Sequence, residues 1–209
     1  MYGTVSQKIG RLLGNLILHP QYISRCLVHN VMNGKTPLDL EIPWFSYAAI
    51  DFLEDYVQPS MSVFEYGSGG STIFFAKRAK RVISVEDNPK WFEWVSRRVE
   101  QHGLGNVSLR LCEFNFKEPS GFEHSAYLHA IPDEKLDIIV IDGSEEWTQV
   151  RQICFEKAEG RVTEGGIIIV DDSWRYPGLR KHHHAKRFQI LQSVGPCRPG
   201  VTSTDIFFY

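Results

Sequence analysis

Five short segments of this chain are rich in apolar or β-branched residues and carry an acid at or near their last residue. The segments span residues 63–66, 81–85, 107–111, 136–141 and 166–170. The acids are Glu65, Glu86, Glu113, Asp142 and the pair Asp171-Asp172. Carboxylates can bind hydroxyl or ammonium groups, accept a proton, or hold a hard metal ion. If the segments are parallel strands, these acids meet at the sheet edge where α/β proteins bind ligands, although acids also favour helix starts for purely structural reasons.

A glycine-rich turn directly follows the first of these segments. It reads Gly67-Ser68-Gly69-Gly70, with Glu65 just before it and Thr72 just after it. Glycine lets the backbone turn tightly and lets a ligand approach the main chain. A dinucleotide site would have a third glycine at position 72, to place a pyrophosphate on the helix that follows. No Lys or Arg stands between Met61 and Ala76, and Glu65 would repel a pyrophosphate. The turn therefore favours a ligand with an ammonium group and no phosphate, such as S-adenosylmethionine.

Glu86 ends the second segment. An acid at this place suits the two hydroxyl groups of an adenosine ribose. Nicotinamide dinucleotides and S-adenosylmethionine both contain this ribose, so Glu86 predicts an adenosine ligand but does not distinguish the two cofactors. Glu65 does distinguish them, because it disfavours the pyrophosphate.

The spacing of apolar residues predicts the elements that position these groups. The five strands alternate with helices over residues 72–78, 90–101 and 147–161, which is typical of a parallel sheet with right-handed crossovers. Two last strands, over 187–194 and 203–209, have no clear helix between them and predict an antiparallel hairpin at a sheet edge. The expected fold class is α/β, a doubly wound, mostly parallel, seven-stranded sheet with a closing antiparallel strand.

An N-terminal helical extension is expected before this sheet. Residues 5–18 place their apolar side chains on one helix face, and further helices are expected over 21–32, ended by Asn33-Gly34, and over 44–56. We expect residues 1–58 to form a helical extension packed on the core and residues 61–209 to form one ligand-binding domain. The alternative for the first helix is a contact with a second copy of the chain or with a membrane surface.

Composition narrows the classes of function. The 209 residues suit one domain, and the net charge of -2 argues against bulk nucleic-acid binding. No apolar run reaches the ~18 residues of a membrane span, and the first twenty residues do not resemble a signal peptide. The four cysteines are scattered, without zinc-site spacing, and are expected to be reduced: Cys26, Cys112, Cys154 and Cys197. A cytoplasmic protein is the expectation.

The order of these motifs resembles that of the class I S-adenosylmethionine-dependent methyltransferases, and more narrowly that of a poorly characterised bacterial subgroup. The resemblance covers residues 61–209. The matching stretches are Phe64 to Thr72, Ser84 to Asn88 with the following Trp91, Ile141 to Gly143, Gly165 to Ser173, Tyr176 to Gly178 and Ser203 to Tyr209. One departure is Ser144-Glu145-Glu146, which stands where the subgroup often has a basic residue.

The resemblance implies which residues bind the cofactor. Glu65 and the glycine turn would hold the methionine end of S-adenosylmethionine, and Glu86 would bind the ribose. The adenine would lie beside Asp87, Asn88, Glu113 and Phe114. The complete expected set is Glu65, Tyr66, Gly67, Ser68, Gly69, Gly70, Thr72, Glu86, Asp87, Asn88, Trp91, Glu113, Phe114, Asp142 and Gly143.

Methyl transfer is an in-line displacement in which the enzyme aligns the acceptor and sometimes removes a proton. Asp142, Asp171 and Asp172 are the catalytic candidates. Metal-dependent O-methyltransferases hold Mg²⁺ with acids from the same two strand ends, so a Mg²⁺ site formed by these three acids is an alternative hypothesis. The aromatic residues Trp147, Trp174 and Tyr176 could stack on a planar or sugar acceptor, which favours a small-molecule or sugar hydroxyl.

Two alternative functions and the role of one motif are not decided by the sequence. A nicotinamide-dependent oxidoreductase would need glycine at position 72 and no acid at position 65. A non-catalytic module on the same fold would have its cofactor site filled, and nothing in the glycine turn indicates this. The three histidines His182 to His184 lie in a basic stretch over 180–187, which predicts either a cationic patch near the acceptor or a solvated surface turn.

Overall fold

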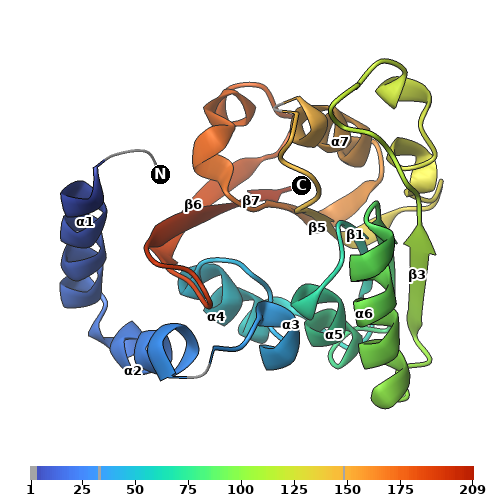
Figure 1. Ribbon diagram of the computed structural model, residues 1–209. Coiled ribbons are helices and arrows are strands. Elements are labelled where there is room, and N and C mark those ends of the chain that lie inside the picture. Colours follow the sequence, from blue (N-terminus) through green and yellow to red (C-terminus); the bar gives the residue numbers. More distant parts are fainter. Residues whose placement is uncertain (1–3, 33, 148) are drawn as a thin grey trace.

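A seven-stranded sheet forms the centre of the computed structural model, which describes residues 4–32, 34–147 and 149–209 (Figure 1). The strands are β1 (Ser62–Tyr66), β2 (Arg81–Glu86), β3 (Val107–Leu111), β4 (Leu136–Ile141), β5 (Val162–Val170), β6 (Arg187–Val194) and β7 (Val201–Phe208). Their order is β3-β2-β1-β4-β5-β7-β6. Strands β1 to β5 pair in parallel, whereas β7 runs antiparallel to both β5 and β6. The predicted α/β class and the closing antiparallel strand are confirmed.

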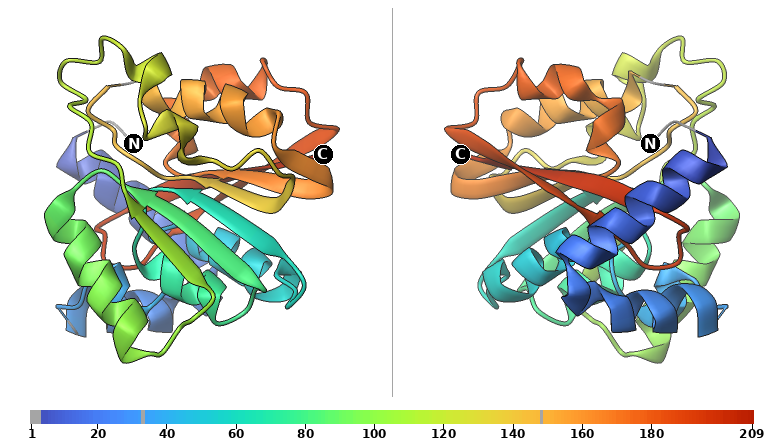
Figure 2. Two further views of the ribbon diagram at one scale, coloured as in Figure 1. Left: turned by 90° about the vertical axis from the view of Figure 1, so that its right-hand side faces the viewer. Right: turned by 90° about the vertical axis from the view of Figure 1, so that its left-hand side faces the viewer.

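Helices cover both faces of the sheet (Figures 1 and 2). On one face lie α4 (Tyr47–Tyr56), α5 (Gly70–Ala76) and α6 (Pro89–Gln101), and on the other lies α7 (Val150–Glu159). Strand β4 shows why a continuous apolar run was needed. Ile138 and Val140 pack with α4 and α5 residues, while Ile139 and Ile141 pack with α7 residues, and all four are fully buried. Side chains alternate between faces along a strand, so a strand between two layers is apolar at every position.

Several helices differ from the sequence-based expectation in their bounds. The helix predicted over 147–161 is α7, which begins at Val150, and Thr148 lies outside the described residues. The helix predicted over 21–32 is a 3₁₀ turn (Pro20–Tyr22), α2 (Ile23–Leu27) and a π-helix (Val28–Met32). Its predicted stop at Asn33 also lies outside the described residues.

A short helix that the sequence did not predict, α3 (Pro37–Leu40), packs beside α5. Thr36 and Asp39 form a reciprocal capping box at its start, which satisfies the first free backbone N–H groups. A Cβ atom at Gly70 would lie 2.4 Å from the Pro37 carbonyl oxygen and 2.2 Å from that of Ile42. The first turn of α5 therefore lies directly against the segment around α3, and only glycine fits there.

Helix α1 (Val5–Leu18) crosses over β6 and β7, as Figure 2 shows in its right-hand view. Leu12 and Leu16 pack on the core, and the backbone N–H of Val194 in β6 donates to Asn15 Oδ1 at 3.1 Å. The other apolar side of the helix is exposed, at Val5, Ile9, Leu13 and Ile17. Among the described residues, no helix is both long and apolar enough to cross a membrane. The domain boundary near residue 60 stays a prediction.

Candidate functional site

A pocket of about 930 Å³ lies at the carboxyl ends of β1, β2, β4 and β5, the sheet edge that the acids predicted. Its size is in the range of small-molecule and cofactor sites. Further parts of the wall come from helix α1, residues 35–37 at the start of α3, Trp44, Arg151, residues 174–175, and residues 197–202, which include the first two residues of β7. The predicted cofactor residues that line it are Gly67, Ser68, Gly69, Gly70, Glu86, Asp87, Trp91, Asp142 and Gly143.

The glycine turn brings the ends of β1 and β4 together. Gly67 has a φ of 96°, a left-handed conformation that favours glycine. A Cβ atom there would lie 2.7 Å from the Asp142 carbonyl oxygen. Any side chain at position 67 would therefore push apart the turn and the strand end that carries Asp142.

Glu65 lies behind this turn and does not line the pocket. Its side chain is buried, and Oε2 accepts hydrogen bonds from Thr72 Oγ1 at 2.8 Å and from Ser84 Oγ at 2.6 Å. Thr72 Oγ1 also accepts from the Gly69 N–H, so the carboxylate braces the turn. Burial raises the pKa of Glu65 above its ordinary value. The other oxygen, Oε1, is buried without a partner in the described part of the chain, and a donor such as an ammonium group would satisfy it.

Glu86 presents a carboxylate to the pocket. Oε2 accepts from the Ser68 N–H at 3.1 Å and from Ser68 Oγ at 2.7 Å, and Oε1 accepts from the Asn88 N–H at 3.1 Å. Burial raises the pKa of this carboxyl. A carboxylate has about four acceptor sites, so lone pairs remain for ribose hydroxyls. The placement of Glu86 beside the glycine turn fits a ligand with a ribose, as S-adenosylmethionine has.

Other predicted cofactor residues have structural contacts. Tyr66 is fully buried and its hydroxyl donates to the Leu128 carbonyl oxygen. Asn88 caps α6 by accepting from two backbone N–H groups. Neither Glu113 nor Phe114 lines the pocket, and the Phe114 ring packs on the Phe116 and Phe122 rings. Contacts of these residues with a cofactor stay predictions.

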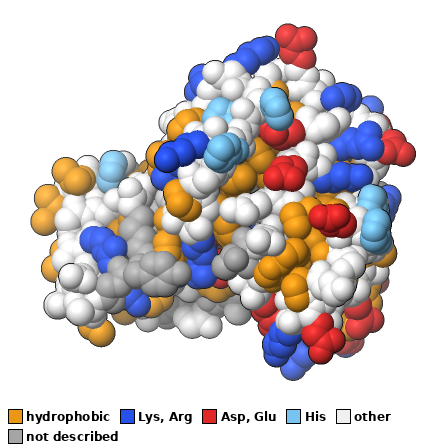
Figure 3. Space-filling model, turned by 90° about the horizontal axis from the view of Figure 1, so that it is seen from above, with side chains coloured by type: hydrophobic (Ala, Val, Ile, Leu, Met, Phe, Trp, Pro, Cys, Tyr) orange, Lys and Arg blue, Asp and Glu red, His pale blue; other side chains and the backbone are white. Residues whose placement is uncertain are grey.

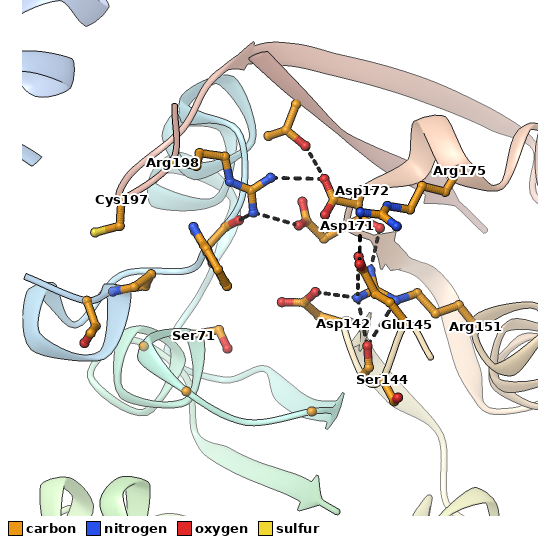
Figure 4. Close-up of a pocket in the computed structure, with 18 of the residues that line it drawn as sticks. Ser71, Asp142, Ser144, Glu145, Arg151, Asp171, Asp172, Arg175, Cys197 and Arg198 are labelled. Carbon is orange, nitrogen blue, oxygen red and sulfur yellow. Dashed lines mark hydrogen bonds and ion pairs between the residues drawn. The ribbon is translucent and has the colours of Figure 1, made fainter. Parts of the chain in front are cut away.

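Arg151 of α7 ties the ends of β4 and β5 together beneath the pocket (Figure 4). This buried guanidinium donates to the carbonyl oxygens of Gly143 at 2.8 Å and Asp171 at 2.7 Å. It also pairs with the carboxylates of Asp142 at 3.2 Å and Glu145 at 3.4 Å. Because it contacts two strand ends at once, it sets the position of Asp142.

Arg198, from the β6–β7 connection, faces the two acids at the end of β5 (Figure 4). Its guanidinium lies 3.0 Å from Asp172 and 3.6 Å from Asp171, and it donates to the Trp44 carbonyl oxygen at 2.7 Å. Asp172 has a φ of 46°, an uncommon conformation for a residue other than glycine. Such strain is found where surrounding contacts hold a functional group in place, and here Arg198 and the Thr202 hydroxyl hold Asp172.

The three catalytic candidates differ in proton affinity. Burial raises the pKa of Asp142 to about 7, against the opposing effect of Arg151. Burial and the nearby Asp142 raise the pKa of Asp171 well above its ordinary value. Burial also acts to raise the pKa of Asp172, but Arg198 and Thr202 outweigh it and lower the pKa to about 2. Asp142 is therefore near its midpoint at neutral pH, as a general base should be.

The Mg²⁺ hypothesis gains no support from this arrangement. Asp142, Asp171 and Asp172 are bound by arginine side chains. Among the residues that the structure describes, no group of three or more His, Cys, Asp and Glu side chains is placed to hold a metal ion.

The basic stretch at 180–187 lies outside this site, since none of its residues lines the pocket. His183 packs against the Phe188 and Phe207 rings, His184 pairs with Glu159, and Arg180 pairs with Asp205. His183 and Arg180 therefore pack on β7, and His184 contacts α7. Of the three aromatic residues predicted to stack on an acceptor, Trp174 lines the pocket, whereas Trp147 and Tyr176 do not.

Sequence reasoning missed Arg151, Arg198, Trp44 and the two α1 residues Lys8 and Arg11, all of which line the pocket. None stands in a motif, and each comes from an element whose position depends on long-range packing. Glu145 was noted only as a departure from the subgroup, yet it pairs with both Arg151 and Arg175.

A family model described as "Methyltransferase domain" matches residues 64–173. A curated relative is the probable cobalt-precorrin-6B C(15)-methyltransferase (decarboxylating) of Methanothermobacter thermautotrophicus, 32% identical over 105 residues. The match covers 50% of this chain and 47% of that relative, so the chain spans about half of its length.

Solved structures support the fold. An O-methyltransferase from Bacillus cereus in complex with SAH has a TM-score of 0.58 at 18% identity, covering all of this chain and 93% of that chain. An rRNA methylase from Streptococcus thermophilus has a TM-score of 0.55 at 15% identity, covering 84% and 98%. The names of the three relatives refer to different acceptors, so the acceptor has to be inferred from the site.

Proposed function

This chain belongs to the methyltransferase-domain family and to the class I S-adenosylmethionine-dependent methyltransferases, and we propose that it transfers the methyl group of S-adenosylmethionine to a hydroxyl oxygen of a small molecule or sugar. The observation that carries the proposal is the Asp142 carboxyl, which lines the pocket beside the glycine turn and has a pKa of about 7. A hydroxyl acceptor needs such a base, because its oxygen becomes a good nucleophile as the proton leaves.

Different residues of this chain would bind the cofactor, accept the proton and orient the base. The bound cofactor supplies a methyl group made electrophilic by its sulfonium. Glu86 would bind the ribose hydroxyls, and the glycine turn would hold the methionine end. Asp142 would accept the acceptor's proton at a carboxylate oxygen, while Arg151, which contacts both Asp142 and the neighbouring main chain, keeps that carboxylate oriented.

Replacing Glu86 with glutamine is expected to weaken binding of S-adenosylhomocysteine by about 10- to 100-fold. The glutamine amide is neutral, so its hydrogen bonds to the ribose hydroxyls are weaker than those of a carboxylate. A hydrogen bond to a charged group contributes about 1.5–3 kcal/mol to binding. Titration calorimetry measures the change. Glu93→Gln, in the exposed part of α6, is the matched control and should bind like the wild type. Equal affinity in the Glu86 variant would contradict the assignment of the ribose site.

The acceptor class can be tested with S-adenosylmethionine that carries a ¹³C-labelled methyl group. Hydroxylated aromatics and sugars are offered together with cell extract, and NMR then distinguishes O-methyl from C-methyl and N-methyl products. The proposal expects O-methyl products that Asp142→Asn does not form. A labelled methyl group on a carbon atom of the acceptor, or on RNA, would contradict it.

Some other expectations stay predictions. A homodimer through the exposed face of α1 and a cytoplasmic location are two of them. A non-catalytic module on this fold would bind S-adenosylhomocysteine yet form no labelled product, so the same experiment separates it from the enzyme.

A further inference from the structure

The pocket is lined by six basic residues, of which Lys35 lies before α3 and Arg175 pairs with Glu145, and the other four form two groups. Arg151 and Arg198 lie deep and are bound to the acids at the ends of β4 and β5. Lys8 and Arg11 of α1 line the pocket as exposed residues. Within the described residues, the Lys8 ammonium group has no carboxylate partner.

Helix α1 is held so that Lys8 faces the pocket. Lys8, Leu12 and Leu16 follow one another at four-residue spacing, so they lie along one helix face. Leu12 and Leu16 pack on the core, and Asn15 accepts the Val194 N–H. The same packing that fixes the helix on β6 and β7 therefore directs Lys8 inward. In Figure 3 basic side chains are visible both on the α1 side, at the left, and on the adjoining body.

Five of the six acids that line the pocket, all but Asp87, are already held by other residues of the chain. Asp142, Glu145, Asp171 and Asp172 are each paired with an arginine of the deeper group or with Arg175. Glu86 is held by donors of the glycine turn and by the Asn88 N–H. The Lys8 ammonium group is thus available to a ligand, and lysine and arginine side chains form their strongest hydrogen bonds with anionic oxygens.

We infer that α1 forms a wall of the acceptor site and that Lys8 and Arg11 bind an anionic oxygen group, a phosphate or a carboxylate, of the acceptor. The inference rests on the proposed function and narrows it to anionic hydroxyl compounds. It also assigns a role in substrate choice to a helix that lies outside the residues matched by the family model, 64–173.

Thermal melting of the full chain saturated with S-adenosylhomocysteine tests this inference, because the cofactor part of the pocket is then filled. Inorganic phosphate and acetate are titrated at constant ionic strength, with chloride as the reference. Phosphate, acetate or both are expected to raise the melting temperature more than chloride does, and which of them acts identifies the anion. Lys8→Gln/Arg11→Gln should weaken that binding about 10- to 100-fold, whereas the matched control Lys117→Gln should not.

The two failures are distinguishable. If S-adenosylhomocysteine itself does not stabilise the wild type, the proposed function fails. If it does, and phosphate and acetate act like chloride or protect the double variant as well as the wild type, only the anionic acceptor is overturned. An unchanged affinity of the double variant for S-adenosylhomocysteine shows that the substitutions leave the fold and cofactor site intact.

Discussion

Asp142→Asn is expected to lower kcat for methyl transfer by about 10²- to 10⁴-fold, the usual contribution of a general base. The amide has nearly the shape of the carboxyl, so the contact with Arg151 is changed without a change in volume. Initial rates of S-adenosylhomocysteine formation measure the loss. Asp55→Asn, in the exposed part of α4, is the control and should keep the wild-type rate. S-adenosylhomocysteine should bind both variants.

The pH dependence gives this prediction a second readout. A base acts in its deprotonated form, and the pKa of Asp142 is about 7. The wild-type rate should therefore rise about tenfold per pH unit below that value and level off above it. In Asp142→Asn the rise should be absent. A variant that keeps both the rate and the rise would show that another group accepts the proton.

Arg151→Met is expected to lower the free energy of unfolding by about 3–5 kcal/mol, since it leaves the partly buried Asp142 carboxylate without its cation and two carbonyl oxygens without their donor. The Arg151 side chain is only 4% exposed and contacts Asp142, Glu145 and two carbonyl oxygens. Urea unfolding measures the difference. The control Arg97→Met removes an exposed pair with Glu93, and should cost about 1 kcal/mol or less.

The cost of Arg151→Met should grow with pH. Arg151 acts to lower the pKa of Asp142, so its loss raises that pKa further above the unfolded value. At pH 5 the Asp142 carboxyl is protonated in both proteins, so the substitution costs only the Arg151 contacts with Glu145 and the two carbonyl oxygens. Above about pH 7 the wild type holds an ionised Asp142 beside a cation, whereas the variant must bury the charge alone or keep the proton. A pH-independent difference would mean that Arg151 stabilises the fold by packing.

Local pattern predicted the sheet well and the pocket wall poorly. Residues 138–141 had to be apolar on both faces, and alternate residues of this run do pack on the two helical layers. The acids at the strand ends were found because a parallel sheet brings those ends to one edge. Gly67 was found because tight turns leave a strong local signal.

The rest depends on tertiary contacts that a local pattern does not contain. Arg151 lies within a helix, and the sequence pattern of a helix does not distinguish an arginine that is buried from one that is exposed. Arg198 reaches Asp172 across 26 positions of sequence, and Asn15 meets Val194 across 179. Glu65 was assigned to the cofactor from its chemistry, whereas its hydrogen bonds to Thr72 and Ser84 show a bracing role that spacing did not predict.

The central claim is that the glycine turn and Glu86 form a site for S-adenosylmethionine and not for a dinucleotide. Thermal melting of the wild-type protein with S-adenosylhomocysteine and with NAD, each in large excess, tests it most directly. Ligand at about 100 times its Kd adds roughly 2.7 kcal/mol of stability. We expect S-adenosylhomocysteine alone to raise Tm. A rise with NAD alone, or with neither ligand, would contradict the claim.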